Sequence, residues 1–268
     1  MKNNIFFWII ALIITLLSAY YQRTTGPTYP LKGNILFNEK EIKYNLDRSF
    51  AGDGDCPVKI STEIQGIQGT LIWKRHNTKD ADSTVEMRNE NGVLTGYLRH
   101  REPASKIDYQ IRLTKDNIEK YIPSKNSYVV IRFRGDVPAY ILIPHILFMF
   151  LTMLISTRTG LEVLKKDNFN YFKLMLYTIA TLIIGGFILG PLVQKFAFNE
   201  YWTGVPFGFD LTDNKTLIAF IGWMVAFIAH YKSKNPKYWI LGAAILMLVV
   251  YLIPHSVLGS ELDYSKVK

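Results

Sequence analysis

The chain has 268 residues, of which 49% are hydrophobic and 20% charged, and its formal net charge at pH 7 is +9. These averages hide two compositions, because residues 22–137 are polar while residues 1–21 and 138–260 carry long apolar runs. This division is typical of a membrane protein with one polar domain and argues against a purely soluble protein. The single cysteine, Cys56, excludes a disulfide bond within the chain.

Five apolar stretches approach or reach the length that crosses a membrane, which is roughly 17 to 25 residues. They are Ile5–Tyr21, Pro138–Ser156, Tyr171–Leu192, Leu217–Tyr231, which is short, and Tyr238–Ile253. None of them contains Asp, Glu or Arg. We therefore expect five transmembrane helices, one before the polar domain and a four-helix domain over residues 138–260.

The first apolar stretch has two interpretations. Lys2 supplies the positive start of a signal peptide, and the apolar region that follows is short. However, Leu17-Ser18-Ala19 is a poor cleavage site, and the apolar region is longer than a usual signal core. We interpret residues 1–21 as an uncleaved N-terminal anchor, with a cleaved signal peptide as the alternative.

The polar domain, residues 22–137, shows short alternating runs separated by turn residues, which indicate β-strands. The predicted strands are Leu31–Phe37, Glu41–Leu46, Val58–Ile64, Thr70–His76, Thr84–Arg88, Val93–Arg99, Ile107–Leu113 and Tyr128–Arg134. Asn91-Gly92 between two of them predicts a hairpin. The pattern from Leu71 to Ile111 resembles the middle strands of immunoglobulin or fibronectin type III domains. That resemblance implies an all-β sandwich with Trp73 in its core.

Positive residues indicate the orientation. Lys and Arg gather in the loop after the second predicted helix and again between Lys232 and Lys237. Because cytoplasmic loops carry an excess of these residues, we expect the N terminus to lie in the cytoplasm. The sandwich domain and the C-terminal tail, residues 261–268, then lie outside an inner (cytoplasmic) membrane. The net charge reflects this topology, and we expect no binding of nucleic acid.

The tripeptide Ile-Pro-His occurs twice, ending at His145 and at His255. An ionisable side chain within a membrane is costly and therefore indicates a function. In the expected topology both histidines lie toward the outer face, beside acidic residues of a loop and of the tail. The candidate metal ligands are His145, His255, Asp210, Asp213, Glu261 and Asp263. A structural role is also open to Asp213, as the N-cap of the fourth helix.

Imidazole nitrogen together with carboxylate oxygen suits a divalent metal such as zinc, manganese or iron. An open coordination position would permit hydrolytic or transfer chemistry. The candidate ligands are far apart in the sequence, and no HExxH motif joins them. A haem held between the two histidines is disfavoured, because His145 and His255 are expected at different depths.

Two runs of the sequence resemble segments of an uncharacterised group of bacterial five-helix membrane proteins. The runs are Thr203–Thr216 and Ile253–Tyr264. That group has the same layout of one helix, an outside immunoglobulin- or fibronectin-like domain and four further helices. The resemblance therefore implies the architecture, and it implies no catalytic residue.

Two functional hypotheses follow from these patterns. The first is an integral cell-envelope protein that binds a protein partner through its sandwich domain, as an accessory protein or a subunit of a larger membrane complex. Besides that partner it would contact membrane lipids. The alternative is an outward-facing metal- or ion-binding membrane site with hydrolase or transferase activity. Transport is disfavoured, because the five helices contain no evident inverted repeat.

Overall fold

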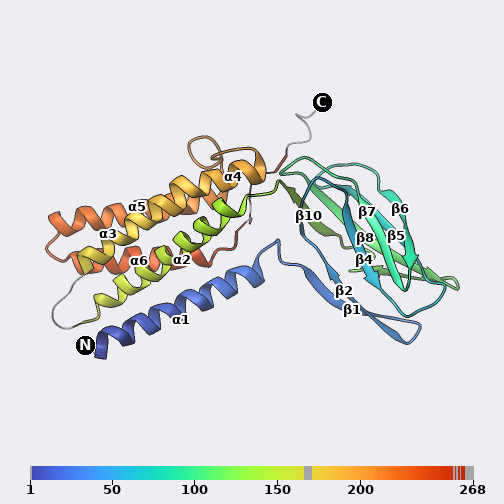
Figure 1. The fold of residues 1–268 in the computed structure, drawn as a ribbon, viewed down its shortest axis with the longest axis horizontal. Helices are drawn as coiled ribbons and strands as arrows, with labels where there is room; N and C mark the ends of the chain where they lie inside the picture. The colour runs from blue at the N-terminus through green and yellow to red at the C-terminus, as the bar shows by residue number, and fades with distance from the viewer. Residues whose placement is uncertain (1, 166–170, 256, 258, 260, 263–268) are drawn as a thin grey trace. The chain divides into compact units, whose positions relative to one another are not determined.

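The computed structural model describes residues 2–165, 171–255, 257, 259, 261 and 262. The chain divides into two compact units, which are drawn in Figure 1. The helical unit comprises Met1–Pro27 and Val137–Ser260. The β unit comprises Thr28–Asp136 and Glu261–Lys268.

The helical unit contains the elements expected from the apolar stretches. They are α1 (Lys2–Thr25), α2 (Ala139–Glu162), α3 (Tyr171–Leu182), the π-helix η1 (Ile183–Leu189), α4 (Gly190–Phe198), α5 (Leu211–Lys232) and α6 (Pro236–Leu252). Because α3, η1 and α4 follow one another without interruption, Tyr171–Phe198 is one continuous helical segment. This segment, α1, α2 and α5 are each long and apolar enough to cross a membrane, and α6 is a shorter apolar helix.

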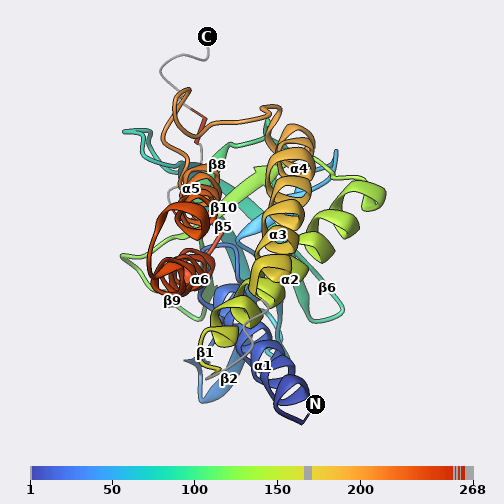
Figure 2. The ribbon, with the colours of Figure 1, turned by 90° about the vertical axis from the view of Figure 1, so that its left-hand side faces the viewer.

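Large apolar side chains and close glycine contacts hold the helices together. Trp223 of α5 is fully buried, with Met153, Met175 and Met247 of the neighbouring helices in the same core. A Cβ added at Gly160 of α2 would lie 2.7 Å from the Cβ of Ala244 in α6, so these two helices approach closely there. Figure 2 shows α5 and α6 side by side.

The π-helix lies directly before Gly190-Pro191, a pair of residues that commonly breaks an α-helix. Instead of breaking, the helix widens, and the N–H of Gly190 donates to the carbonyl of Gly185. Pro191 has no N–H to donate, and in a regular α-helix its ring would clash with the carbonyl four residues earlier. A wider turn before Pro191 relieves that clash, so the segment continues to Phe198.

The described residues of the β unit form ten strands. They are β1 (Leu31–Phe37), β2 (Lys40–Leu46), β3 (Ser49–Ala51), β4 (Cys56–Ser61), β5 (Gln68–Arg75), β6 (Ser83–Glu90), β7 (Val93–Leu98), β8 (Lys106–Lys115), β9 (Ile118–Ile122) and β10 (Val129–Arg134). The hairpin predicted at Asn91-Gly92 joins β6 to β7, and both residues have positive φ, as a tight two-residue turn requires. The sequence patterns did not predict β3 and β9.

The strands form a two-stranded and an eight-stranded sheet. β1 pairs with β2, and the larger sheet runs in the order β3-β10-β8-β5-β6-β7-β4, with β9 also on β8. All pairings are antiparallel except that of β3 with β10. The larger sheet curls into a nearly closed barrel, so the predicted all-β domain is present but a two-sheet sandwich is not confirmed.

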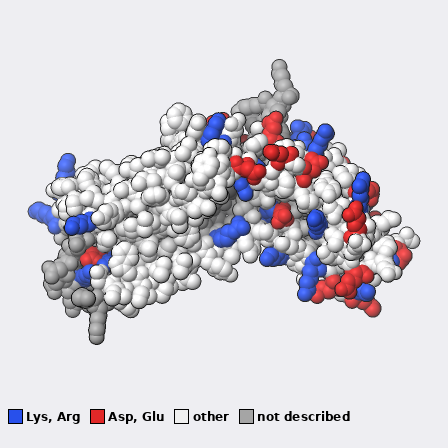
Figure 3. Space-filling view, in the orientation of Figure 1, with Lys and Arg blue, Asp and Glu red and all other residues white. Residues whose placement is uncertain are grey.

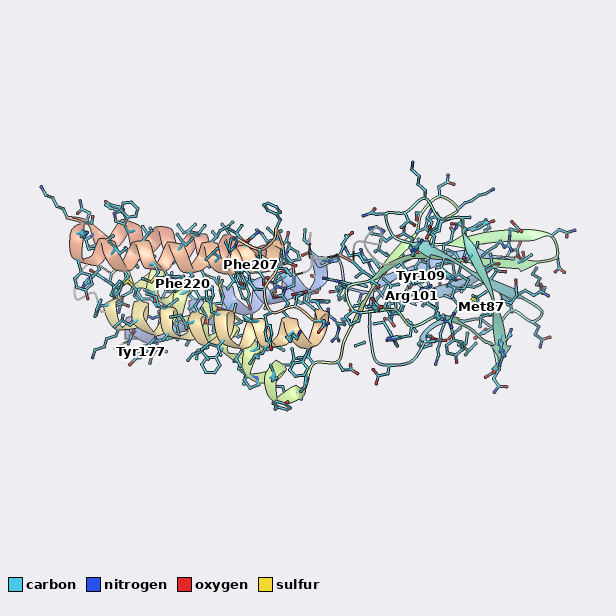
Figure 4. All side chains as sticks on the ribbon, turned by 90° about the horizontal axis from the view of Figure 1, so that it is seen from above. Met87, Arg101, Tyr109, Tyr177, Phe207 and Phe220 are labelled. Atoms are coloured by element: carbon cyan, nitrogen blue, oxygen red, sulfur yellow. The ribbon has the colours of Figure 1, made fainter. Side chains whose placement is uncertain are left out.

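The core of the β unit is built from alternate residues of the strands. Tyr109 of β8, labelled in Figure 4, is fully buried and donates its hydroxyl to the carbonyl of Asp47 at 2.8 Å. Trp73, expected to be the core tryptophan, is only partly buried, and the guanidinium of Arg101 lies over its ring. The fully buried aromatic residues of this core are therefore Tyr109, Phe37 and Phe133, and Trp73 packs against the core from its edge.

Candidate functional site

Polar side chains gather at one end of the helical unit. There α1, α4 and α6 end and α2 and α5 begin, and we call this region the polar end (Figure 1). Among its polar residues are Gln22, His145, Gln194, Asp210, Asp213, Asn214, Lys215 and His255. Figure 3 shows that Lys, Arg, Asp and Glu are absent from the visible middle of the helical unit and lie toward its ends.

The α4–α5 loop is held by the first turn of α5. Asp213 accepts hydrogen bonds from the N–H of Thr203 at 2.6 Å and of Gly204 at 3.1 Å. Asn214 accepts one from the N–H of Val205 at 2.8 Å. The N-cap of α5 is Asp210, which accepts from the N–H of Thr212, so the expectation that Asp213 is the N-cap was wrong. Asp213 instead binds the backbone of the preceding loop.

Glycine is required where this loop meets α5. A Cβ added at Gly204 would lie 2.7 Å from the Cβ of Asp213. Beyond it, Phe207, labelled in Figure 4, and Phe209 are 83% and 89% exposed. Trp202 fixes the other side of the loop, since its ring stacks on that of Phe187 in η1. The loop is thus anchored at its base and presents two aromatic side chains at its tip.

Lys215 and Gln22 bind the end of α6. The Lys215 ammonium, which is 5% exposed, donates to the carbonyl of Ile253 at 2.6 Å. Gln22 of α1 donates to the carbonyl of Tyr251 at 2.7 Å. The last carbonyls of a helix have no partner within the helix, and a positive charge near them is favourable. These two side chains therefore join α5 and α1 to the end of α6.

His145 contacts the π-helix. Its Nδ1 lies 2.9 Å from the carbonyl oxygen of Gly185. Because a carbonyl only accepts, this hydrogen bond places the proton on Nδ1 and leaves Nε2 as the basic nitrogen. His255 follows α6, and Lys215, His145 and Asp210 are close enough to act on it electrostatically. The two Ile-Pro-His histidines thus lie at the same end of the helical unit.

The predicted metal ligands are divided between the two units of the chain. His145, His255, Asp210 and Asp213 belong to the polar end, whereas Glu261 belongs to the β unit. Asp263 lies outside the described residues. Within the described part of the chain, no three His, Cys, Asp or Glu side chains are close enough to hold a metal ion. A buried Lys215 beside Asp210 also disfavours a second cation there.

Glu261 takes part in an ion cluster of the β unit. It binds the ammonium of Lys106 and accepts from Asn77 at 3.3 Å. Burial raises the pKa of its carboxyl, but Lys106, His76 and Asn77 together outweigh burial, so the pKa lies below its usual value. In the same region His76 donates Nδ1–H to Asp108 at 2.6 Å. The pairing of β5 with β8 brings Asp108 near His76, and such a non-local pairing leaves no local signal in the sequence.

A second buried charge cluster lies near the opposite end of α2. Arg158 and Glu162 are 2% and 1% exposed and form an ion pair at 2.5 Å. The Arg158 guanidinium also reaches Asn4 and lies against the rings of Phe7 and Trp8 in α1. The predicted helix ended at Ser156, so both residues were interpreted as a loop. Their i, i+4 spacing was the signal that could have identified the pair.

The β unit is open along one seam, between β2 and β4. β2 has no strand on its second side within the described residues, and β4 is the last strand of the larger sheet. Two hollows follow this line. One of about 610 Å³ lies between Lys40–Lys43 and the residues that follow β4, and one of about 270 Å³ lies between Asn45–Asp47 and Cys56–Lys59. We call this line the β2–β4 seam.

Comparison with known proteins assigns no family. No model of a protein family matches the chain, and no curated protein matches it.

Proposed function

We propose that this chain is an integral membrane protein of the cell envelope that acts as a binding or accessory protein. The apolar helices serve as its anchor, and the β unit engages a partner, either alone or within a larger membrane complex. The positive residues of the loops favour a cytoplasmic N terminus with the β unit and the C terminus outside. Two observations support a role in binding: the buried charges of the polar end bind their own backbone, and the β unit has an open seam.

The seam is the observation that carries the proposal. A strand with an unpaired edge presents N–H and C=O groups that an extended peptide can pair with. Within the described residues, both strands that border the seam have such an edge, and the two hollows lie along it. We therefore propose an extended protein segment as the ligand of the β unit.

Several residues along the seam hinder non-specific pairing of its edge strands with strands of other proteins. Lys40, Lys43 and Lys59 are exposed there, and Pro57 lies within β4. Lysine and proline on edge strands are common protection against aggregation. Proline fits an edge strand only where its nitrogen, which carries no hydrogen, faces away from the neighbouring strand, here β7. The backbone nitrogen of Pro57 therefore faces the seam. Because backbone groups alternate sides with a period of two residues, the N–H of Lys59 faces the seam too.

The test uses the full-length chain in its native membrane. A photo-crosslinking amino acid at Lys43 or Lys59 should capture the same discrete partner. The same group at Lys120, which is exposed on β9, should capture nothing comparable. Lys59→Pro removes one N–H that faces the seam and should reduce capture at Lys43 several-fold while the far-ultraviolet circular dichroism is unchanged. Equal capture at Lys120, or capture that Lys59→Pro does not alter, would refute the proposal.

One observation favours the alternative of a metal or ion site. A histidine that commits Nδ1–H to a carbonyl, as His145 does to Gly185, has the orientation common among metal-binding histidines. Elemental analysis of the full-length protein, purified in detergent without chelator, tests this alternative. Near-stoichiometric zinc, manganese or iron that His145→Ala abolishes would support it, and absence of metal would reject it.

A further inference from the structure

An apolar groove runs along the outer face of α5 and α6. Its volume is about 650 Å³, and its walls are apolar and aromatic side chains, among them Ile221, Val225, Trp239 and Leu246. The lining residues extend from 218 to 225 on α5 and from 238 to 246 on α6. α5 and α6 are antiparallel and Gly222 lies against Leu246, so Ile218 lies beyond the level of Leu246. At 1.5 Å per residue the groove is therefore about 15–18 Å long.

Gly242 lines the bottom of this groove, and no contact within the chain requires a glycine there. A Cβ added at Gly242 would meet no atom within 4 Å. Gly222, also in the groove, is different, since its Cβ would lie 2.7 Å from Leu246 and the contact of α5 with α6 needs it to be small. A glycine within a helix is less favourable than alanine. The space at Gly242 is therefore available to a molecule outside this chain.

One end of the groove is positively charged. α5 ends at Lys232 and α6 begins at Pro236, and the connection and first turn carry the exposed residues Lys232, Lys234 and Lys237. The sequence has no Asp or Glu between residues 214 and 260. Blue side chains are visible at this end of the helical unit in Figure 3. Tyr238 and Trp239 line the same end, and such aromatic residues are typical of the membrane–water interface.

We propose that the groove binds an anionic phospholipid. One acyl chain lies over Gly242 between α5 and α6, and the headgroup phosphate lies at the lysines of the α5–α6 connection. Basic residues beside a gap between transmembrane helices are the chemistry that selects anionic headgroups. The length of the groove fits one leaflet, whose hydrocarbon depth is about 15 Å. A partner helix would instead contact the chain through both leaflets.

Native mass spectrometry of the full-length protein in detergent tests the proposal, with dioleoylphosphatidylglycerol and dioleoylphosphatidylcholine as probes. The anionic lipid should be retained preferentially, by about fivefold for each lysine that contributes. Gly242→Leu fills the groove and should abolish the retained anionic lipid. Val249→Phe adds bulk to an exposed position of α6 outside the groove and should leave retention unchanged. The variant with Lys232, Lys234 and Lys237 changed to Gln should bind the two lipids equally.

The outcomes that overturn the proposal are distinct. Equal retention of the two lipids by the unaltered protein would remove the headgroup site, and full retention by Gly242→Leu would remove the acyl-chain site. If Gly242→Leu changes the oligomeric state without changing lipid retention, a helix of a second chain occupies the groove instead. Should Gly242→Leu fail to fold, Val225→Phe narrows the groove from the α5 wall and must lower retention in the same way.

Discussion

Asp213 accepts hydrogen bonds from the backbone of Thr203 and Gly204, and Lys215 donates one to the carbonyl of Ile253. Both side chains are more than nine-tenths buried. A buried charge is costly unless hydrogen bonds satisfy it, and here backbone groups of distant segments do so. At the residue scale, these ionisable groups of the polar end therefore stabilise the α4–α5 loop and the end of α6.

Removal of the Asp213 carboxylate should destabilise the helical unit. Asp213→Ala leaves the N–H groups of Thr203 and Gly204 without their acceptor, which costs about 1–3 kcal/mol. Asp213→Asn keeps one accepting oxygen and should lose less. Thermal unfolding in detergent measures the difference, with Glu200→Ala, an exposed acid of the same loop, as the control. Equal effects of Asp213→Ala and Glu200→Ala would contradict this assignment.

At the scale of the elements, glycines decide which helices touch. Gly160 permits the close approach of α2 to α6, and Gly186 of η1 lies against α5, where an added Cβ would be 2.7 Å from Thr216. The π-helix contributes as well, since the carbonyl of Gly185 receives both the Gly190 N–H and His145. The widened turn before Pro191 thus supplies a contact between α2 and the Tyr171–Phe198 segment.

A matched pair of substitutions separates packing from helix propensity. Gly160→Ala places a methyl group 2.7 Å from Ala244 and should destabilise the protein by about 1–3 kcal/mol, as overpacking does. Gly242→Ala meets no atom within 4 Å and should be neutral or stabilising by up to about 1 kcal/mol. Unfolding by denaturant in mixed micelles compares the two. If both substitutions had the same sign, the close contact of α2 with α6 would be wrong.

At the scale of the whole molecule, the chain combines an apolar helical unit with a β unit that has its own core. Cys56 belongs to that second core and is 1% exposed. Burial and the charge of Asp47 raise the pKa of its thiol to about 12. Since the thiolate is the reactive form, the native cysteine should not react at neutral pH. Cysteines introduced at other positions can therefore be labelled to determine the topology without interference from Cys56.

We expect a membrane-impermeant maleimide to label the Lys120→Cys variant in intact cells, because the β unit is proposed to lie outside. The Lys234→Cys variant should react only after the membrane is permeabilised. The unaltered chain, with Cys56 alone, should remain unlabelled until it is denatured. Labelling of Lys234→Cys in intact cells would reverse the proposed orientation.

The strands show what local patterns can and cannot predict. β1 was predicted with its observed bounds, because alternation of apolar and polar residues is a local property. β9 was missed although the sequence has a signal, the turn-forming pair Asp116-Asn117. In the structure both residues have positive φ and form the turn from β8. β3 has only three residues, and its partner β10 is distant in the sequence, so no local pattern predicts β3.

From the sequence alone, five apolar helices and an all-β domain could be predicted, because helix length, hydropathy and strand alternation are properties of neighbouring residues. The tertiary structure decided that the sheet curls into a nearly closed barrel with a β2–β4 seam. It also decided that Asp210 rather than Asp213 is the N-cap, that Glu261 binds Lys106, and that Arg158 is buried with Glu162. The physical reason is that capping geometry, strand pairing and burial depend on which segments meet in space, and composition does not specify that.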